Sequence, residues 1–274
     1  MQIGIFAKTF SATGALPVFK AVKQAGYEVA QFNMACLGMP SMPETIAPAL
    51  ADEIAKASAA SGVAIAAISG TYNMIHPDPT ARADGLARLA AIIRVAPLMG
   101  TRLVTLCTGT RAAKDQWKYH PDNTSKEAWR DLLEEMGKAV VLAEESNVDL
   151  GIEPELANVV SSAEQARQLI NELKSPRLRI VLDPANLFEV ALPHESQSIV
   201  AQAVDLLGAH IAMAHAKDRR ANGEIAAAGS GVIDFPHFVR CLRRAGFDGP
   251  LVTHGLSERE APDVAAFLRR VIAA

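Results

Sequence analysis

The sequence predicts a single closed (β/α)8 barrel, the TIM-barrel fold, and three observations support that prediction. Short apolar runs alternate with amphipathic stretches along the whole chain, and there are eight of each. The 274 residues shared among eight units give about 34 residues per unit, a size that suits this barrel. No GxGxxG motif follows the first apolar run and no GxxxxGK[ST] motif occurs, which disfavours a nucleotide-binding open sheet.

The eight expected strands are short, and most of them lack alternation between polar and apolar residues. That pattern is typical of parallel strands that are covered on both faces. Glycine, proline or asparagine bounds most of them, as expected where a strand gives way to a turn. In chain order the expected strands are residues 3–7, 29–32, 63–69, 103–107, 149–153, 179–183, 210–215 and 250–254.

Helical periodicity fills the segments between these strands, for example over residues 43–62 and 125–147. Ser125 and Ser162 stand where a helix N-cap is expected, because their hydroxyls can accept a hydrogen bond from the first turn. Glycines follow expected helices at C-cap positions, namely Gly26, Gly62, Gly100 and Gly246. No linker or shift in composition divides the chain, so we expect one domain over residues 1–274.

The longest expected connection covers residues 108–124, after the fourth strand. It carries Trp117, Tyr119 and His120. A loop of this length in a compact domain is usually a lid or a binding loop. A solvated excursion with one aromatic side chain tucked down fits the sequence equally well, but a position on the active face of the barrel favours the lid.

Bulk composition excludes several classes of protein. Half of the residues are apolar, 21% are charged and the formal net charge is -3, which gives no overall attraction to nucleic acid or anionic lipid. Cys36, Cys107 and Cys241 lie far apart without a CxxC pair, so neither a disulfide framework nor a thiolate zinc site is expected. There is no signal-peptide pattern and no apolar run long enough to span a bilayer. We expect a cytoplasmic protein with no membrane partner, and the sequence leaves a homo-oligomer open.

The last four expected strands each end in a side chain that can bind a metal ion: Glu153, Asp183, His215 and His254. In a TIM barrel the chemistry takes place at these carboxyl ends of the strands. A buried carboxylate needs a cation, a metal or hydrogen bonds. Each residue alone has an ordinary alternative, such as an ion pair, a braced turn or a buried histidine. Four of them converging on one rim favour a metal site.

Both carboxylates precede a proline, in Glu153-Pro154 and Asp183-Pro184. Proline cannot continue a central strand, and it holds the residue before it in extended conformation. We therefore expect each strand to stop at its candidate ligand. Asp218, three residues beyond His215, is expected to orient that imidazole, to bind the metal directly, or to form an ion pair with a neighbouring arginine.

The donor set indicates which metals suit the site. Two carboxylates and one or two imidazoles, without a thiolate, suit manganese, cobalt, zinc or magnesium and disfavour copper, haem and iron–sulfur clusters. Imidazole ligands shift the preference from magnesium towards the others. We expect a divalent metal cofactor, with manganese as the first choice.

Several stretches resemble the xylose-isomerase-like barrels, a superfamily that includes sugar isomerases, ketose 3-epimerases, hydroxypyruvate isomerase and inosose-type dehydratases, with endonuclease IV as a distant relative. The resemblance covers nearly the whole chain and is specific for the superfamily, not for a substrate. The stretches are YNMIHPD (72–78), GIEPE (151–155), VLDPAN (181–186), HAKDRR (215–220), GSGVIDF (229–235) and GPLVTHGLSE (249–258).

The resemblance implies that Glu153, Asp183 and His215 match three of the family's metal-binding positions. His254 departs from the pattern, because members usually end the eighth strand in a glutamate that is both a metal ligand and one of two catalytic bases. Imidazole can bind a metal and, with an ordinary pKa near 6.5, can act as a base. The nearby carboxylates Glu258 and Glu260 either replace the missing glutamate or lie on the surface.

By this resemblance we expect a metal-dependent isomerase or epimerase of a sugar or another α-hydroxycarbonyl compound. The metal polarises the carbonyl, a base removes the neighbouring C–H proton, and an enediolate forms. Glu153 and His254 are the candidates for proton transfer. The candidate substrate-binding residues are His76, Trp117, His120, Asn186, Lys217 and Arg219.

Three alternatives remain at this stage. The same site suits a lyase or dehydratase of a keto-sugar or inosose. The histidine at position 254 also fits a sugar-binding barrel that has lost activity. An endonuclease acting on abasic DNA is disfavoured, because that chemistry uses several zinc ions with many histidine ligands, whereas this chain has seven histidines and no basic excess.

Overall fold

The computed structural model describes residues 1–274 and forms a closed barrel of eight parallel strands. Each strand pairs with its neighbours in the chain, β9 pairs with both β1 and β7, and the pairing of β6 with β7 completes the closure. The predicted (β/α)8 barrel is therefore confirmed. The barrel strands are β1 (Gln2–Phe6), β2 (Val29–Phe32), β3 (Ala64–Ser69), β4 (Leu103–Leu106), β5 (Asp149–Ile152), β6 (Leu178–Leu182), β7 (Ile211–Arg219) and β9 (Pro250–Thr253).

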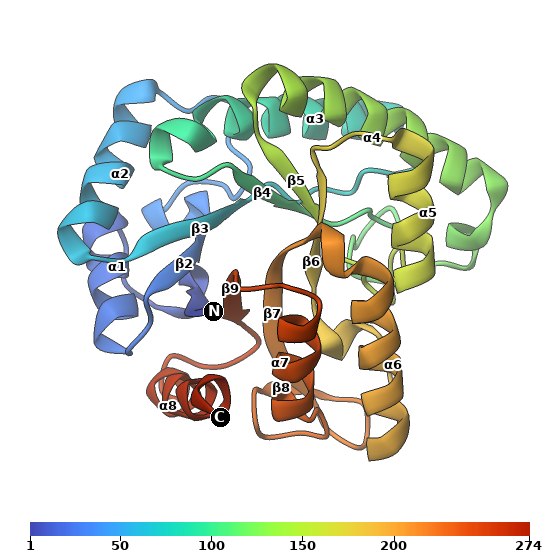
Figure 1. Ribbon diagram of the computed structural model, residues 1–274. Helices are drawn as coiled ribbons and strands as arrows, with labels where there is room; N and C mark the ends of the chain where they lie inside the picture. The colour runs from blue at the N-terminus through green and yellow to red at the C-terminus, as the bar shows by residue number, and fades with distance from the viewer.

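Helices surround the strands (Figure 1). Ser125 and Ser162 cap α4 and α5 by accepting hydrogen bonds from the backbone N–H groups of Ala128 and Gln165, as predicted. No helix combines the length and the apolarity that crossing a bilayer requires. The helices are α1 (Ala15–Gln24), α2 (Pro48–Ser61), α3 (Pro79–Val95), α4 (Lys126–Ser146), α5 (Ala163–Leu173), α6 (Pro193–Leu207), α7 (Phe235–Arg244) and α8 (Ala261–Ala273).

Two predicted elements need correction. The helix expected over 43–62 begins only at Pro48. Proline disfavours helical backbone in the residue before it, so Pro48 opens the helix as its first residue. The seventh strand was expected over 210–215, but β7 continues to Arg219 because its last three residues pair antiparallel with β8 (Ile225–Ala227). A short hairpin therefore extends beyond the barrel after His215.

The inside of the barrel is built in two layers, one apolar and one polar. The apolar layer contains the small cluster of Ala67, Leu103, Val181, Met213 and Val252. Two glycines complete it, because a Cβ on Gly4 or Gly151 would stand within 3 Å of these or neighbouring valine side chains. Successive side chains alternate across a strand, so residues two positions further on point inward again. This next layer consists of Phe6, Gln31, Ser69, Thr105, Glu153, Asp183, His215 and His254.

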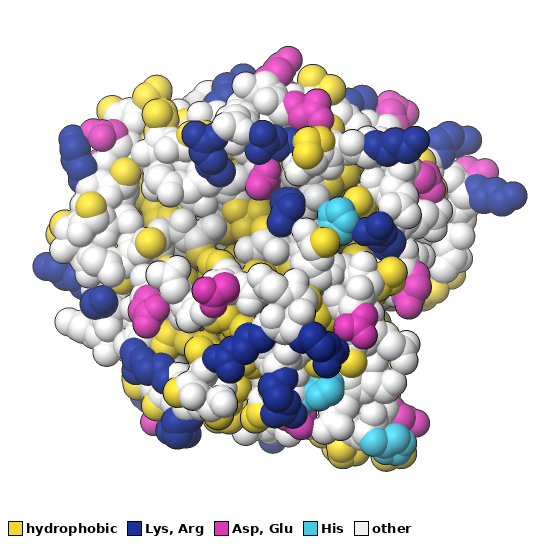
Figure 2. All heavy atoms as spheres, viewed as in Figure 1, with side chains coloured by type: hydrophobic (Ala, Val, Ile, Leu, Met, Phe, Trp, Pro, Cys, Tyr) yellow, Lys and Arg dark blue, Asp and Glu magenta, His cyan; other side chains and the backbone are white.

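Surface charge is mixed. On the face shown in Figure 2, lysine and arginine side chains lie among aspartate and glutamate side chains, and neither sign gathers into one field. This distribution agrees with the small formal net charge of -3.

Candidate metal centre

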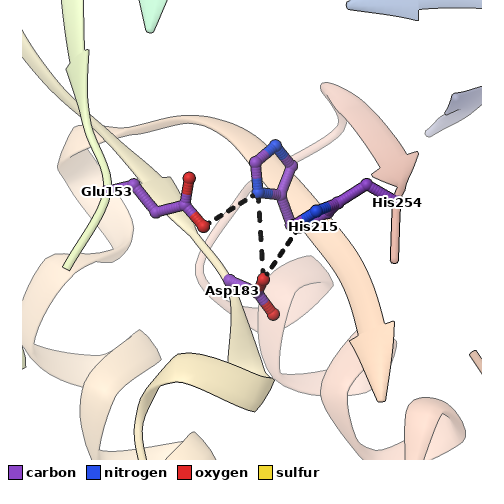
Figure 3. A group of neighbouring side chains, drawn as sticks. All are labelled: Glu153, Asp183, His215 and His254. Carbon is purple, nitrogen blue, oxygen red and sulfur yellow. Dashed lines mark hydrogen bonds and ion pairs between the residues drawn. The ribbon is translucent and has the colours of Figure 1, made fainter. Parts of the chain in front are cut away.

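The four predicted ligands meet at the polar layer of the barrel. Each offers one ligand atom, and the four atoms lie within 4.8 Å of one another (Figure 3). Glu153, Asp183 and His254 each follow the last residue of their strand, and His215 lies within β7 at the same level. The sequence prediction that these residues converge is confirmed.

Local backbone structure aims the carboxylate of Asp183. Pro184 ends β6 and begins a 3-10 turn over Pro184–Asn186. In that turn Asp183 Oδ1 accepts a hydrogen bond of 3.0 Å from the backbone N–H of Ala185. The second oxygen, Oδ2, is thereby directed to His215, Lys217 and His254.

Contacts within the cluster are close. His215 Nδ1 lies 3.2 Å from Glu153 Oε1 and 3.9 Å from Asp183 Oδ2. His254 Nε2 lies 3.1 Å from the same Asp183 oxygen. The two imidazole rings are tilted against each other with centroids 4.5 Å apart. Every potential ligand atom is thus within reach of one central point.

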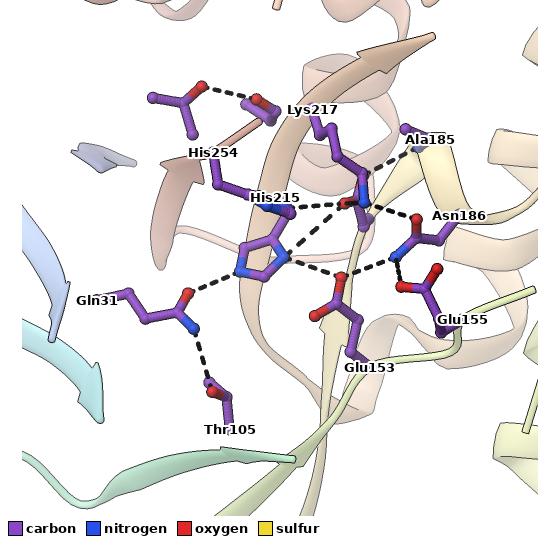
Figure 4. Close-up of polar contacts among 12 residues, drawn as sticks. Gln31, Thr105, Glu153, Glu155, Ala185, Asn186, His215, Lys217 and His254 are labelled. Atoms are coloured by element: carbon purple, nitrogen blue, oxygen red, sulfur yellow. Dashed lines mark hydrogen bonds and ion pairs between the residues drawn. The ribbon is translucent and has the colours of Figure 1, made fainter. Parts of the chain in front are cut away.

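Lys217 supplies a positive charge at this point. Its Nζ atom lies 2.9 Å from Asp183 Oδ2 and donates a hydrogen bond of 2.7 Å to Asn186 Oδ1 (Figure 4). Only 7% of the residue is exposed. A buried ammonium needs such partners, because removing an ion from water is costly. The carboxylates therefore already attract one cation to the site.

Electrostatics within the cluster oppose the effects of burial. Burial alone would raise the pKa of Asp183, but Lys217 and the two imidazoles lower that pKa further than burial raises it. Burial would lower the pKa of His215, yet Glu153 raises it above its usual value. His254 differs, since burial and the neighbouring His215 both lower its pKa. The site combines ionised carboxylates with one imidazole that favours its neutral form.

Glu155 is a second carboxylate beside Glu153. Burial, followed by the charge of Glu153, raises the pKa of Glu155 to about 7. Asn186 links the two by donating hydrogen bonds of 2.8 Å to Glu153 Oε1 and 2.8 Å to Glu155 Oε2. With its carbonyl accepting from Lys217, Asn186 holds three charged groups in place.

Neutral polar side chains face the cluster from the other strands. His215 Nε2 lies 2.8 Å from Gln31 Oε1. The amide nitrogen of Gln31 donates to Ser69 Oγ at 3.2 Å and to Thr105 Oγ1 at 3.1 Å. These contacts connect β2, β3 and β4 to the imidazole on β7. Figure 4 shows the part of this chain that runs from Thr105 through Gln31 to His215.

A pocket of about 510 Å³ opens above the cluster. Glu153, His215 and His254 lie at its wall together with Glu155 and Lys217, and only three of the 17 lining residues are hydrophobic. The other lining residues are Phe6, Lys8, Gln31, Asn33, Ser41, Ser69, Thr71, Thr105, Gln116, Trp117, Ile225 and Gly255. Such a polar wall suits a ligand rich in hydroxyl groups.

The donor set fits a divalent metal ion. Two carboxylates and two imidazoles converge without a thiolate, a combination that suits manganese, cobalt, zinc or magnesium. The position of Lys217 beside Asp183 Oδ2 shows that this corner of the site attracts positive charge.

The model of the family described as the xylose isomerase-like TIM barrel matches residues 19–271. The chain belongs to this family. No curated protein matches the sequence significantly.

Several solved structures share the fold of this chain at low sequence identity. The chain is similar to the apo form of 3-keto-D-glucoside 4-epimerase from E. coli, with 17% identity over 98% of this chain and 99% of that one and a TM-score of 0.77. It is also similar to D-psicose 3-epimerase from Clostridium cellulolyticum H10, with 15% identity, 99% of each chain covered and a TM-score of 0.74. L-ribulose 3-epimerase aligns with 18% identity over 99% of this chain and 94% of that one, with a TM-score of 0.77.

Two of the predicted substrate-binding residues, Trp117 and Lys217, line the pocket. Trp117 belongs to the loop over 108–124 and is 55% exposed, so its ring lies at the rim. Asn186 lies behind the carboxylates and is almost fully buried, because all of its polar atoms are used within the cluster. It holds one candidate ligand, Glu153, in place and does not line the pocket.

The other three predicted substrate-binding residues do not line the pocket. The guanidinium of Arg219 donates to the backbone carbonyls of Ala185 and Gly223. His76 contacts Ala113 O, and its second ring nitrogen accepts from the backbone of Asp78. His120 accepts a hydrogen bond from the backbone N–H of Asp122 at the start of a 3-10 turn. His76 therefore contacts the loop over 108–124 at Ala113, and His120 lies near the end of the same loop.

Three further carboxylates lie outside the cluster. Asp218 is neither a ligand nor a partner of His215; its side chain accepts hydrogen bonds from four backbone N–H groups, three of them in the loop over 229–233. It therefore holds that loop against β7. The exposed Glu258 accepts from Ser11, and Glu260 accepts from Ser257. Both lie on the surface and outside the pocket lining.

Sequence reasoning missed Glu155, Gln31, Ser69 and Thr105. The spacing within the strands was the available signal. Gln31, Ser69 and Thr105 each lie two residues beyond a residue of the apolar layer inside the barrel. Glu155 follows Glu153 at the same spacing in the stretch GIEPE.

Proposed function

We propose that the chain is a divalent-metal-dependent epimerase or isomerase of a sugar or another α-hydroxycarbonyl compound. One observation carries the proposal: four ligand atoms of Glu153, Asp183, His215 and His254 lie within 4.8 Å of one another, and all of these residues except Asp183 line a polar pocket. The similarity to barrels whose names describe sugar epimerases supports the same reaction class.

Glu153, Asp183, His215 and His254 would hold the metal ion. When bound, the ion supplies Lewis-acid polarisation of a substrate carbonyl. Asn186 holds Glu153 in position through its amide, and the turn at Pro184 holds Asp183. Because these carboxylates are fixed before a ligand arrives, the site needs little rearrangement to bind the ion.

Proton transfer is assigned to Glu153 and His254. They follow β5 and β9, which are separated in the barrel by β6 and β7, so their side chains approach the pocket from different directions. An epimerisation removes a proton from one face of a carbon atom and returns a proton to the other. Two proton-transfer groups on separate strands suit that requirement.

The substrate is expected to contact neutral polar groups and one charge. Asn33, Ser41 and Thr71 line the pocket and suit the hydroxyl groups of a sugar. The ammonium of Lys217 can donate a hydrogen bond to a substrate oxygen next to Asp183. Trp117 at the rim offers an apolar ring face to a sugar ring.

The test is exchange of the proton next to the carbonyl with solvent. Candidate ketoses are incubated in D2O with Mn2+, and deuterium incorporation is followed by NMR. We expect incorporation with the wild-type protein, a loss of at least 100-fold with Glu153→Gln, and unchanged incorporation with Glu258→Gln. Glu258 is the matched control because it is an exposed glutamate outside the pocket.

Each other outcome has a defined meaning. Full activity after exhaustive removal of metal would contradict the proposed mechanism. Saturable sugar binding without exchange would identify a binding protein in place of an enzyme. Exchange accompanied by loss of water from the substrate would identify the lyase, which the same site also suits.

A further inference from the structure

We propose that Gln31 is a positioning residue that keeps a proton on His215 Nε2 and thereby leaves Nδ1 free to bind the metal. The inference rests on the metal centre proposed above and deepens it. Gln31 is a buried residue of β2 and is not one of the four predicted metal ligands.

The geometry separates the two nitrogens of His215. Nδ1 lies 3.2 Å from Glu153 Oε1, on the side of the carboxylates. Nε2 lies 2.8 Å from Gln31 Oε1, on the opposite side of the ring. His215 and Gln31 are both almost fully buried, so water does not compete freely for the contact between them.

The orientation of the Gln31 amide follows from its other contacts in the structure. Its nitrogen donates to Ser69 Oγ and Thr105 Oγ1, which turns its carbonyl oxygen to His215. A carbonyl oxygen only accepts, so the contact requires a proton on Nε2. In the metal-free protein Glu153 also favours a proton on Nδ1, since it raises the pKa of His215. A metal ion that binds Nδ1 displaces that proton, and Nε2 keeps its own proton on Gln31.

An amide serves this purpose without adding charge to the site. Metal-binding histidines usually donate their second N–H to a carboxylate or a carbonyl, which fixes the ring and its tautomer. The site already contains three carboxylates, from Glu153, Glu155 and Asp183. A neutral acceptor at Gln31 fixes the tautomer without adding a fourth negative charge.

The test compares Gln31→Leu with Gln31→Glu. Leucine removes the acceptor, and glutamate keeps it. We expect the affinity for Mn2+, measured by calorimetry, to fall by about 10- to 100-fold in Gln31→Leu. Gln31→Glu should bind Mn2+ at least as tightly as the wild type. In the Zn2+-loaded protein, 15N NMR should show a protonated Nε2 for His215 in the wild type and in Gln31→Glu.

A second variant, which leaves Gln31 unchanged, tests the inference if Gln31→Leu does not fold. Ser69→Ala together with Thr105→Val removes both acceptors of the Gln31 amide nitrogen and leaves the Gln31–His215 contact in place. We expect a smaller loss of affinity, about three- to tenfold, because Gln31 then loses its fixed orientation.

Asp183→Asn separates failure of this inference from failure of the metal centre. Equal Mn2+ affinity in the wild type and Asp183→Asn would overturn the metal centre itself. Loss of affinity in Asp183→Asn but not in Gln31→Leu, with an unchanged Nε2 signal, would overturn only the role of Gln31. A loss in Gln31→Glu as large as in Gln31→Leu would do the same, because it would mean that Gln31 donates to the ring.

Discussion

The two sides of the barrel mouth differ in charge although they lie at the same level. The strands β5, β6, β7 and β9 present carboxylates, imidazoles and an ammonium, whereas β2, β3 and β4 present an amide and two hydroxyls. On both sides, the side chains of the polar layer lie two residues beyond the apolar layer inside the barrel. The charged side holds the groups that can bind an ion and move a proton. The neutral side contacts one of them, His215, through Gln31.

This division has a physical reason. Ionised groups in a buried site are tolerable only where they compensate one another, as Lys217 and Asp183 do at 2.9 Å. The neutral side needs no such compensation, and it satisfies the outward nitrogen of His215 through Gln31. Substitutions on the charged side should therefore have much larger effects than substitutions on the neutral side.

The largest effect is expected for Asp183→Asn, which removes one negative charge from the centre of the charged side. We expect Mn2+ affinity and activity to fall by at least 100-fold, because a neutral amide is a poor ligand and leaves Lys217 without its counter-ion. In the metal-free protein the unpaired buried ammonium should lower the free energy of unfolding by about 3 kcal/mol. Calorimetry and urea unfolding measure the two effects.

The matched variant on the neutral side is Ser69→Ala, which removes one hydroxyl from the Gln31 network. Its Mn2+ affinity should stay within about threefold of the wild type, since Thr105 still anchors the amide. Comparable losses of Mn2+ affinity in Asp183→Asn and Ser69→Ala would contradict the distinction between the two sides.

Lys217→Met tests the internal competition on the charged side. The ammonium beside Asp183 Oδ2 repels an incoming dication, so its removal should tighten Mn2+ binding by about tenfold. The same variant should lower kcat/KM, because the hydrogen-bond donor for the substrate is lost. Weaker Mn2+ binding in Lys217→Met would show that the lysine supports the metal centre and does not compete with it.

A pH dependence should arise from Glu155, whose pKa is raised by burial to about 7. The folded protein holds this proton more tightly than the unfolded chain, whose glutamate titrates near 4.3. Its contribution to stability is therefore complete below about pH 4 and is lost as the pH rises to 7. In urea unfolding of the metal-free protein, Glu155→Gln should gain stability relative to the wild type between pH 5 and 8. A constant difference between the two proteins over that range would contradict the assignment.

The smallest effect is expected at the rim, beyond both sides. Trp117 is 55% exposed and contacts none of the candidate ligands. Trp117→Ala should raise KM by a few-fold and leave kcat and Mn2+ affinity unchanged, because a rim contact contributes to binding equally in the ground state and the transition state. A large fall in kcat would show that the loop over 108–124 takes part in the chemical step.

The charged side could be predicted from the sequence, and most of the neutral side could not. Glu153, Asp183, His215 and His254 are conspicuous because each interrupts or ends an apolar run, and a buried charge needs an explanation. Ser69 and Thr105 are ordinary strand residues whose role depends on which strands face each other across the barrel. Only the closed barrel brings Gln31 to His215.

Backbone groups are the partners of two charged residues that follow His215. Arg219 is predicted to contact the substrate, and Asp218 to orient His215, to bind the metal or to form an ion pair with a neighbouring arginine. In the fold, Asp218 accepts from backbone N–H groups and Arg219 donates to backbone carbonyls. The pattern of side chains along a sequence does not indicate which of them contact backbone groups. The hairpin of β7 and β8, which these residues stabilise, was missed for the same reason.

The most direct test of the metal centre is the number of Mn2+ ions bound per chain, measured by electron paramagnetic resonance titration of the metal-free protein. We predict one tightly bound ion per chain in the wild type, and no tight binding in Asp183→Asn or in Glu153→Gln. One tightly bound ion in all three proteins would place the metal elsewhere, and no bound ion in the wild type would contradict the metal centre altogether.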